Sequence, residues 1–123
     1  MLIGGYGADR IVGNADEDLL IAGSTSYNDN DQALCAIMQE WTSANSHNGR
    51  VANIQAGTGL AGGFRLNGND GAGQTVFNDN DVDQLTGSQG QDVFWANQVA
   101  DNGGVLDRVT DQAANESWND TDF

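Results

Sequence analysis

The sequence predicts a mainly β domain that carries a small helical insertion. A nine-residue pattern of glycine, aspartate and large apolar residues occupies residues 1–23 and returns at residues 78–96. Apolar residues at helical spacing are confined to the stretch between these two blocks. The chain also has 17 glycines and no proline, which is typical of turns that need positive φ rather than a fixed φ.

The first repeat block, residues 1–23, contains two nonapeptides, which start at Gly4 and Gly13. Each has an aspartate at its sixth place, Asp9 in the first and Asp18 in the second, followed two residues later by a large apolar residue. We interpret the first six residues as a turn and the last three as a short strand whose apolar residue points inward.

The second repeat block, residues 78–96, fits the same template. The nonapeptide that starts at Gly87 has Asp92 at the sixth place, and the nine residues before it place Asp83 there. The apolar positions of both blocks should stack as a narrow core made of Leu2, Ile11, Leu20, Leu85 and Phe94.

The segment between the blocks, residues 24–77, is expected to contain most of the non-repeating structure. Apolar residues recur at helical spacing after a run of Asp and Asn that can cap a helix. We expect helices over 31–43 and 48–54, a glycine-rich turn over 57–63, and short strands over 64–66 and 74–77. Residues 97–123 should add a closing strand over 106–110 and a frayed polar tail, all within one domain of 123 residues.

The charge of the chain limits its partners. Eighteen acidic residues stand against four basic ones, which gives a formal net charge of -14. Such a surface repels nucleic acid and anionic lipid and attracts cations. The single cysteine, Cys35, excludes an intrachain disulfide, and no apolar run has the length of a membrane span. No secretory signal is evident in the N-terminal residues.

The nonapeptide G-G-x-G-x-D-x-U-x, where U is a large apolar residue, resembles the hemolysin-type calcium-binding repeats of the repeats-in-toxin family. The resemblance covers about 40 of the 123 residues, and more loosely the closing stretch LDRVTDQAANE, and it is strongest at Gly4–Val12. It implies a short calcium-binding parallel β-roll, built here from two separated repeat blocks. It also implies Ca²⁺ ions between turns that stack 18 residues apart on the same side of the roll.

The first block departs from this family pattern. The turn expected 18 residues after Gly4 begins at Ala22 and has no aspartate, so the block cannot complete its own calcium sites. We therefore expect the second block to stack on the first, with Asp9 sharing a calcium with Asp83 or Asp92 and Asp18 with the other. The expected metal-site residues are Asp9, Asp18, Asp83, Asp92, Gly4, Gly5, Gly7, Gly13, Asp16, Asp81, Gly87 and Gly90.

Other chemistries fit the sequence less well. The glycines at the start open no predicted helix and no GK[ST] follows, which excludes a phosphate-binding loop. An EF-hand at residues 79–90 lacks the required Gly and the final Glu. His47 has no evident catalytic partner and is expected at the surface, whereas Cys35 is expected to be a buried thiol. We expect Trp41 in the core and Trp95 leaning toward solvent.

The sequence therefore predicts a non-enzymatic, calcium-binding structural module that folds on calcium and acts outside the cell or at its surface. Short rolls need about three repeats or caps for stability, so self-association into a filament, matrix or surface layer is expected. One alternative is a C-terminal calcium-binding and secretion module of a larger secreted adhesin or enzyme. Another alternative is a calcium-dependent carbohydrate-binding module. No nucleic acid partner and no membrane insertion are expected.

Overall fold

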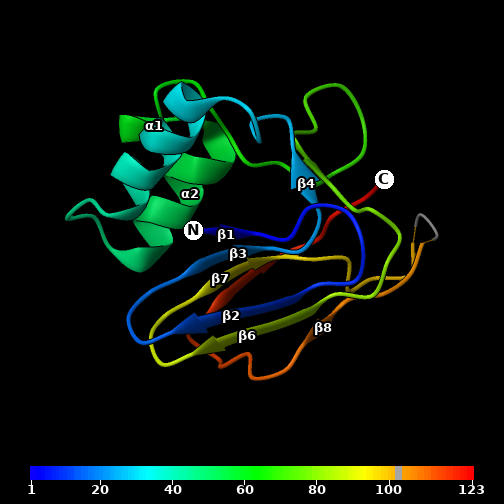
Figure 1. The fold of residues 1–123 in the computed structure, drawn as a ribbon. Coiled ribbons are helices and arrows are strands. Elements are labelled where there is room, and N and C mark those ends of the chain that lie inside the picture. The colour runs from blue at the N-terminus through cyan, green and yellow to red at the C-terminus, as the bar shows by residue number, and fades with distance from the viewer. Residues whose placement is uncertain (102–103) are drawn as a thin grey trace.

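The computed structural model describes residues 1–101 and 104–123 (Figure 1). The chain is about 20% helical and 22% strand. The elements are β1 (Leu2–Ile3), β2 (Arg10–Asn14), β3 (Leu19–Ile21), β4 (Ser24–Thr25), α1 (Asp31–Trp41), α2 (His47–Ala56), a 3-10 helix (Gly59–Ala61), β5 (Val76–Phe77), β6 (Gln84–Ser88), β7 (Val93–Trp95), β8 (Arg108–Val109) and β9 (Ser117–Asn119).

The predicted fold class, a mainly β parallel β-roll, is wrong. The chain has mixed α and β content, with two α-helices and parallel sheets. The physical reason lies in strands β3 and β7, which are apolar and buried at every position. Strands of that kind are covered on both faces. Here α1 and α2 form a full layer against the strands instead of a peripheral insertion (Figure 1).

Two parallel sheets form the β part of the fold. Sheet A has the strand order β1-β3-β7-β9, and sheet B has the order β2-β6-β8. In sheet A, Leu20 pairs with Phe94, and Phe94 pairs in turn with Trp118. In sheet B, Ile11 pairs with Leu85. The second repeat block therefore pairs strand by strand with the first, across the insertion that separates them in sequence.

Two apolar clusters hold the layers together. One lies between the sheets, where Ile11, Leu20, Leu85 and Phe94 are buried. The other joins the outer face of sheet A to the helices, and its buried members are Leu19, Ile21, Ile37, Trp41, Val51, Ile54, Leu66, Val76, Val93 and Trp95. Because strands alternate side-chain direction, one three-residue strand such as β3 contributes to both clusters.

The two expected helices are confirmed, with small differences in their ends. Asn30 caps α1 by accepting from Ala33 N, and Ser46 caps α2 by accepting from Gly49 N. Gly57 ends α2 in the left-handed conformation, with φ +72°. Within the described part of the chain, no helix has the length and apolarity needed to cross a membrane.

Polar contacts attach the helical layer to the sheets. The indole Nε1 of Trp41 donates to the carbonyl of Glu17 at 3.0 Å. The Arg50 guanidinium donates to the Trp41 carbonyl at 2.8 Å and forms an ion pair with Glu17. Arg50 also lies over the Trp41 ring, 4.9 Å from its centroid. These contacts fix the helices over the turn that precedes β3.

Parts of the remaining segments differ from expectation. The strand expected over 64–66 is not formed, whereas β5 forms and pairs antiparallel with β4. The closing strand is confirmed as β8. The polar tail is not wholly irregular, because it contains β9, which joins the edge of sheet A with Trp118 against the cluster between the sheets.

Candidate metal centre

Two columns of turns connect sheet A with sheet B. We call turn stack 1 the turns at residues 4–9, 78–83, and 97–101 with 104–107, which lie at the right of Figure 1. Turn stack 2 comprises the turns at residues 15–18, 89–92 and 111–116, which lie at the left. The parallel registers of the sheets place each turn beside the equivalent turn of the next coil.

Aspartates at equivalent places link the turns of turn stack 1. The amide of Asp9 donates to Asp83 Oδ1 at 2.7 Å, and the amide of Asp83 donates to Asp107 Oδ1 at 3.0 Å. The other oxygen of Asp107 accepts from Asn97 N at 2.8 Å. Each aspartate side chain thus reaches back to the turn of the preceding coil.

Turn stack 2 repeats the arrangement on the other side. The amide of Asp18 donates to Asp92 Oδ1 at 2.7 Å. Asp111, which the sheet register places beside Gly87 and not beside Asp92, accepts from Gly87 N at 3.0 Å and from Ser88 N at 2.8 Å. Asp9 therefore lies beside Asp83, and Asp18 lies beside Asp92, which is one of the two pairings that the sequence left open.

Three carboxylate oxygens in these stacks are buried without a hydrogen-bond partner among the described residues. They are Asp9 Oδ2 and Asp83 Oδ2 in turn stack 1, and Asp92 Oδ2 in turn stack 2. The side chains of Asp83 and Asp92 are fully buried. Buried carboxylates in proteins are normally paired, hydrogen-bonded or bound to a metal, so these three oxygens need an explanation.

Burial also changes how these acids ionise. Desolvation raises the pKa of Asp83 to about 7, opposed by the hydrogen bond from the Asp9 amide. The charges of Asp107, Asp79 and Asp9 raise it further. Desolvation likewise raises the pKa of Asp92 to about 6, and the neighbouring carboxyl of Glu116 raises it further.

The first glycine of each nonapeptide provides room for the aspartate carboxylate. A methyl group at Gly13 would lie 2.5 Å from Asp18 Oδ2, and one at Gly87 would collide with the unpartnered oxygen of Asp92. A methyl group at Gly4 would lie 3.0 Å from Asp9 Oδ2. Glycine at this place therefore keeps the aspartate oxygen directed into the turn.

The other expected glycines shape the turns through their backbone. Gly5, Gly7 and Gly90 have φ of +100°, +97° and +137°. Asp16 and Ser88, the departures from the glycine pattern, also have positive φ, at +76° and +82°. These turns thus keep a left-handed backbone even where the repeat replaces glycine.

The two remaining expected aspartates are exposed. Asp16 lies on turn stack 2, and Asp81 lies on turn stack 1, where its amide donates to Asp79 Oδ1 at 3.1 Å. Neither has an unpartnered buried oxygen. Asp79 was not among the expected residues, although its Oδ2 accepts from Gly7 N at 2.6 Å and so joins two coils.

The sequence interpretation noted a loose resemblance in the stretch that contains Asp107 and Asp111, but it expected neither a third coil there nor a role for these residues in the turns. The third coil follows the second at a spacing of 24 residues, since Leu85 pairs with Val109 and Phe94 with Trp118. A signal was present, because the stretch DQLTG at 83–87 returns as DRVTD at 107–111. A search limited to nine-residue periods does not find it.

Three expectations about single side chains are wrong. His47 is buried, lies edge-on to Trp41, and its Nε2 is 3.2 Å from Ser117 Oγ. Cys35 is exposed, not buried. Trp95 is 1% exposed because the helical layer covers it. The placement of Trp41 in the core is confirmed.

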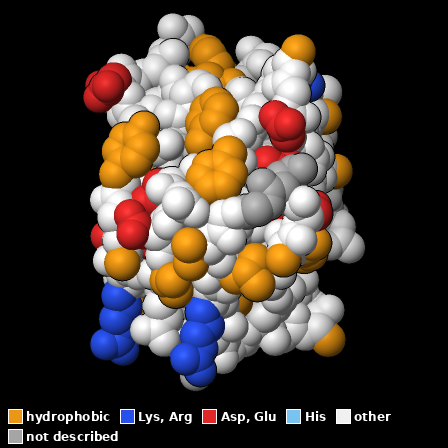
Figure 2. Space-filling model, turned by 90° about the vertical axis from the view of Figure 1, so that its right-hand side faces the viewer, with side chains coloured by type: hydrophobic (Ala, Val, Ile, Leu, Met, Phe, Trp, Pro, Cys, Tyr) orange, Lys and Arg blue, Asp and Glu red, His pale blue; other side chains and the backbone are white. Residues whose placement is uncertain are grey.

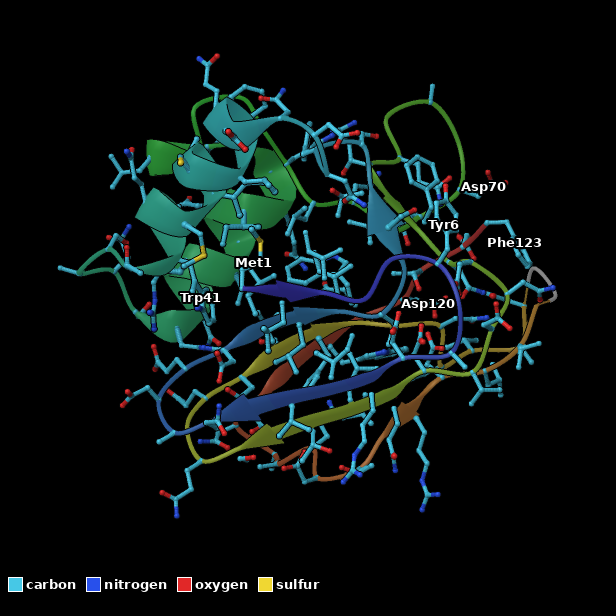
Figure 3. The ribbon with its side chains drawn as sticks, in the orientation of Figure 1. Met1, Tyr6, Trp41, Asp70, Asp120 and Phe123 are labelled. Carbon is cyan, nitrogen blue, oxygen red and sulfur yellow. The ribbon has the colours of Figure 1, made fainter. Side chains whose placement is uncertain are left out.

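The outer surface of turn stack 1 mixes apolar and acidic side chains (Figure 2). Tyr6 is 85% exposed and Phe123 is 48% exposed, and both lie at this end of the molecule (Figure 3). Asp101, Asp120 and Asp122 also gather here, with carboxylate oxygens within 4.8 Å of one another. Asp120 and Asp122 accept backbone amides from Gln98 and Asp70, so this cluster is engaged in structural contacts.

Comparisons with known proteins do not add to this geometry. No protein-family model, no curated protein and no solved structure matches the chain.

Proposed function

We propose that this protein is a calcium-binding structural module whose turn stacks hold the ions. The observation that carries the proposal is the set of three buried carboxylate oxygens without hydrogen-bond partners, on Asp9, Asp83 and Asp92. No cationic side chain neutralises them, because the one ion pair within 4.0 Å among the described residues joins Arg50 and Glu17. A bound cation offsets the cost of burying such charges.

The chemistry of the available ligands favours calcium over other metals. Both stacks offer oxygen atoms, while His47 and Cys35, the only nitrogen and sulfur ligands of these types, belong to the helical layer. Calcium accepts roughly six to eight oxygens and tolerates irregular geometry, whereas magnesium demands a near-ideal octahedron. Zinc prefers histidine and cysteine.

The proposed ligands are distributed over both stacks. In turn stack 1 they come from Asp9 and Asp83, and in turn stack 2 from Asp18 and Asp92. Backbone carbonyls of the glycine turns complete the shells, from Gly4, Gly5, Gly7, Gly13, Gly87 and Gly90, with Asp16 and Asp81 adding negative charge nearby. Because each site joins turns from different coils, ion binding stabilises the pairing of the two repeat blocks and so couples to folding.

The proposal includes a location outside the cell, where sites of modest affinity are filled by the abundant calcium.

The proposal also includes self-association, because both sheets end in strands without neighbours among the described residues. Gly4 N donates into sheet A, as does Ser117 N at the opposite edge. Backbone direction alternates along a strand, so the peptide groups of Ile3 and Trp118 point away from the sheet. Such edges accept further strands.

Calorimetric titration tests the calcium sites. We expect Ca²⁺ to bind metal-free protein and Mg²⁺ to bind far more weakly, with Asp92→Asn losing the site of turn stack 2. Asp29→Asn is the matched control, since it removes one carboxylate from an exposed turn of the insertion. Absence of calcium binding, or equal loss in both variants, would overturn the proposal.

Light scattering tests self-association separately. The weight-average mass is expected to rise with protein concentration in calcium and to return to that of the 12.9 kDa chain in chelator. A lysine at position 12, introduced as Val12→Lys on the open edge of sheet B, should suppress the increase. A monomer at every concentration would contradict self-association and leave the calcium sites to their own test.

A further inference from the structure

Apolar side chains gather on the outer surface of turn stack 1. Within the described part of the chain, nine large apolar side chains are exposed, and six of them belong to this stack or to the tail beside it. These six are Tyr6, Val82, Val99, Val105, Leu106 and Phe123. Single exposed apolar residues are normal on a protein surface, whereas a gathering of them marks an interaction site.

Contacts between the turns bring these side chains onto one surface. The amide of Gly7 donates to Asp79 Oδ2 at 2.6 Å and joins the first turn to the second. The amide of Val105 donates to the second turn at 3.2 Å and joins the third turn to it. A methyl group at Gly104 would lie 2.7 Å from the ring of Phe123, so the tail lies against the third turn.

The two turn stacks differ at one equivalent place, the residue directly before the acid that ends each turn. In turn stack 1, the register of sheet B makes this residue Ala8, Val82 and Leu106, all exposed. In turn stack 2, the register of sheet A makes it Glu17, Gln91 and Asn115. Because turns form with polar residues at this place, the fold does not require the apolar residues of turn stack 1.

Acidic side chains border the apolar ones on this surface. Asp81 is exposed on the second turn, and exposed Asp70 borders the tail, where its amide donates to Asp122 Oδ2 at 2.8 Å. Figure 2 shows Lys and Arg side chains only at the margins of this face. Arg10 and Arg108 lie on the outer face of sheet B, because the residues that alternate with them face the cluster between the sheets.

This combination selects the kind of partner. A nucleic acid or another polyanion would be repelled by the acids. A second copy of this chain would bring the same acids, so a symmetric contact through this surface would place like charges opposite each other. A partner that carries both apolar side chains and Lys or Arg covers the apolar residues and neutralises the acids.

We propose that the outer surface of turn stack 1 binds a partner protein through a cationic amphipathic segment. Apolar side chains of the segment cover Tyr6, Val82 and Leu106, and its Lys or Arg side chains pair with Asp70 and Asp81. Tyrosine is one of the residue types that contribute most to binding at interfaces. The inference does not rest on calcium binding, because these five residues are exposed and none supplies an unpartnered buried oxygen.

Fluorescence anisotropy with labelled synthetic peptides, in calcium buffer, tests this surface. The probe is a peptide of about 18 residues, or about five helical turns, with Lys on one face and Leu on the other. The comparison peptide has the same composition in scrambled order. The amphipathic peptide should bind saturably and more tightly than the scrambled one, and added salt should weaken its binding.

Paired variants locate the bound peptide. Val82→Ser/Leu106→Ser should weaken binding by about fivefold or more, because two apolar side chains leave the contact. Gln91→Ser/Asn115→Ser makes the same change at the equivalent places of turn stack 2 and should keep the full affinity.

Three results would overturn the inference. One is the absence of saturable binding to protein that circular dichroism shows to be folded. Another is equal affinity of the wild type and Val82→Ser/Leu106→Ser, because charge alone then attracts the peptide. The third is loss of self-association in that variant, because the surface then binds a second copy. Absence of calcium binding in the separate titration would contradict the calcium proposal and not this one.

Discussion

Asparagine in place of Asp83 separates the structural use of this side chain from its proposed use as a ligand. The Oδ1 atom accepts from the Asp9 amide at 2.7 Å, and an asparagine oxygen can keep that bond. The buried Oδ2 has no partner among the described residues and becomes an uncharged NH₂ group. The change is nearly isosteric, so it alters charge and ligand character with little change in packing.

The expected magnitude has two parts. Without calcium and above about pH 7, Asp83→Asn should raise the free energy of unfolding by about 1–3 kcal/mol, because the neutral amide avoids the cost of burying the carboxylate charge. With calcium at about 100 times Kd, each filled site stabilises the wild type by about 2.7 kcal/mol. The variant should lose this contribution from turn stack 1, which corresponds to roughly 10 °C in Tm for a chain of this length.

Thermal unfolding followed by circular dichroism, in calcium and in chelator, measures both parts. Asp107→Asn is the matched control one coil further on, because both of its carboxylate oxygens accept backbone amides. That variant should lose about 1–3 kcal/mol in either buffer and keep the full calcium shift. The reasoning fails if Asp83→Asn is destabilised in chelator, or if its calcium shift equals that of the wild type.

Three further predictions concern other parts of the molecule. Gly87→Ala places a methyl group against Asp92 Oδ2 and should weaken calcium binding in turn stack 2 alone; a full-affinity titration would contradict it. Arg50→Ala removes the donor to the Trp41 carbonyl and the partner of Glu17, and should cost about 3–5 kcal/mol by urea denaturation. Arg65→Ala is the control: it removes an exposed hydrogen bond to the Gly73 carbonyl and should cost under about 1 kcal/mol. The pKa of Asp83, raised from 3.8 to about 7, means that this residue favours the folded calcium-free protein most in acid, and that this contribution is lost as pH rises to about 7. Denaturation of metal-free protein across this range should show that loss, and Asp83→Asn should flatten the profile.

Local signals were enough to predict several elements. Helix α1 follows from apolar spacing and from the run of Asp and Asn that supplies its cap at Asn30, and helix α2 follows from apolar spacing alone. The missing aspartate after Ala22 led to the expectation that the second block stacks on the first, and the register of Ile11 with Leu85 agrees with it. Two incomplete repeat blocks in one chain can therefore predict a long-range contact when both follow the same nine-residue period.

The rest depended on contacts that no local pattern specifies. Burial of Trp95 and His47 requires knowing that the helices cover sheet A, because a nonapeptide alone leaves its outward positions facing solvent. The strands Leu19–Ile21 and Val93–Trp95 are apolar at every position. This pattern indicates that a further layer covers the outward-facing side chains of these strands, because both faces of such strands are buried. The third coil was hidden for a different reason, namely its spacing of 24 residues.

The third coil explains why the proposed ion sites are confined to the first two. In the sixth-place aspartates of the earlier coils, one oxygen accepts the amide of the preceding turn and the other has no partner, as in Asp83 and Asp92. In the last coil, Asp107 takes the sixth place in turn stack 1 and uses both oxygens as hydrogen-bond acceptors. In turn stack 2 the register places Glu116, not an aspartate, beside Asp92. A carboxylate with both oxygens engaged by amides is satisfied without a cation. In turn stack 1 the same residue type therefore provides open ligands inside the stack, at Asp9 and Asp83, and a metal-independent cap at its end, at Asp107.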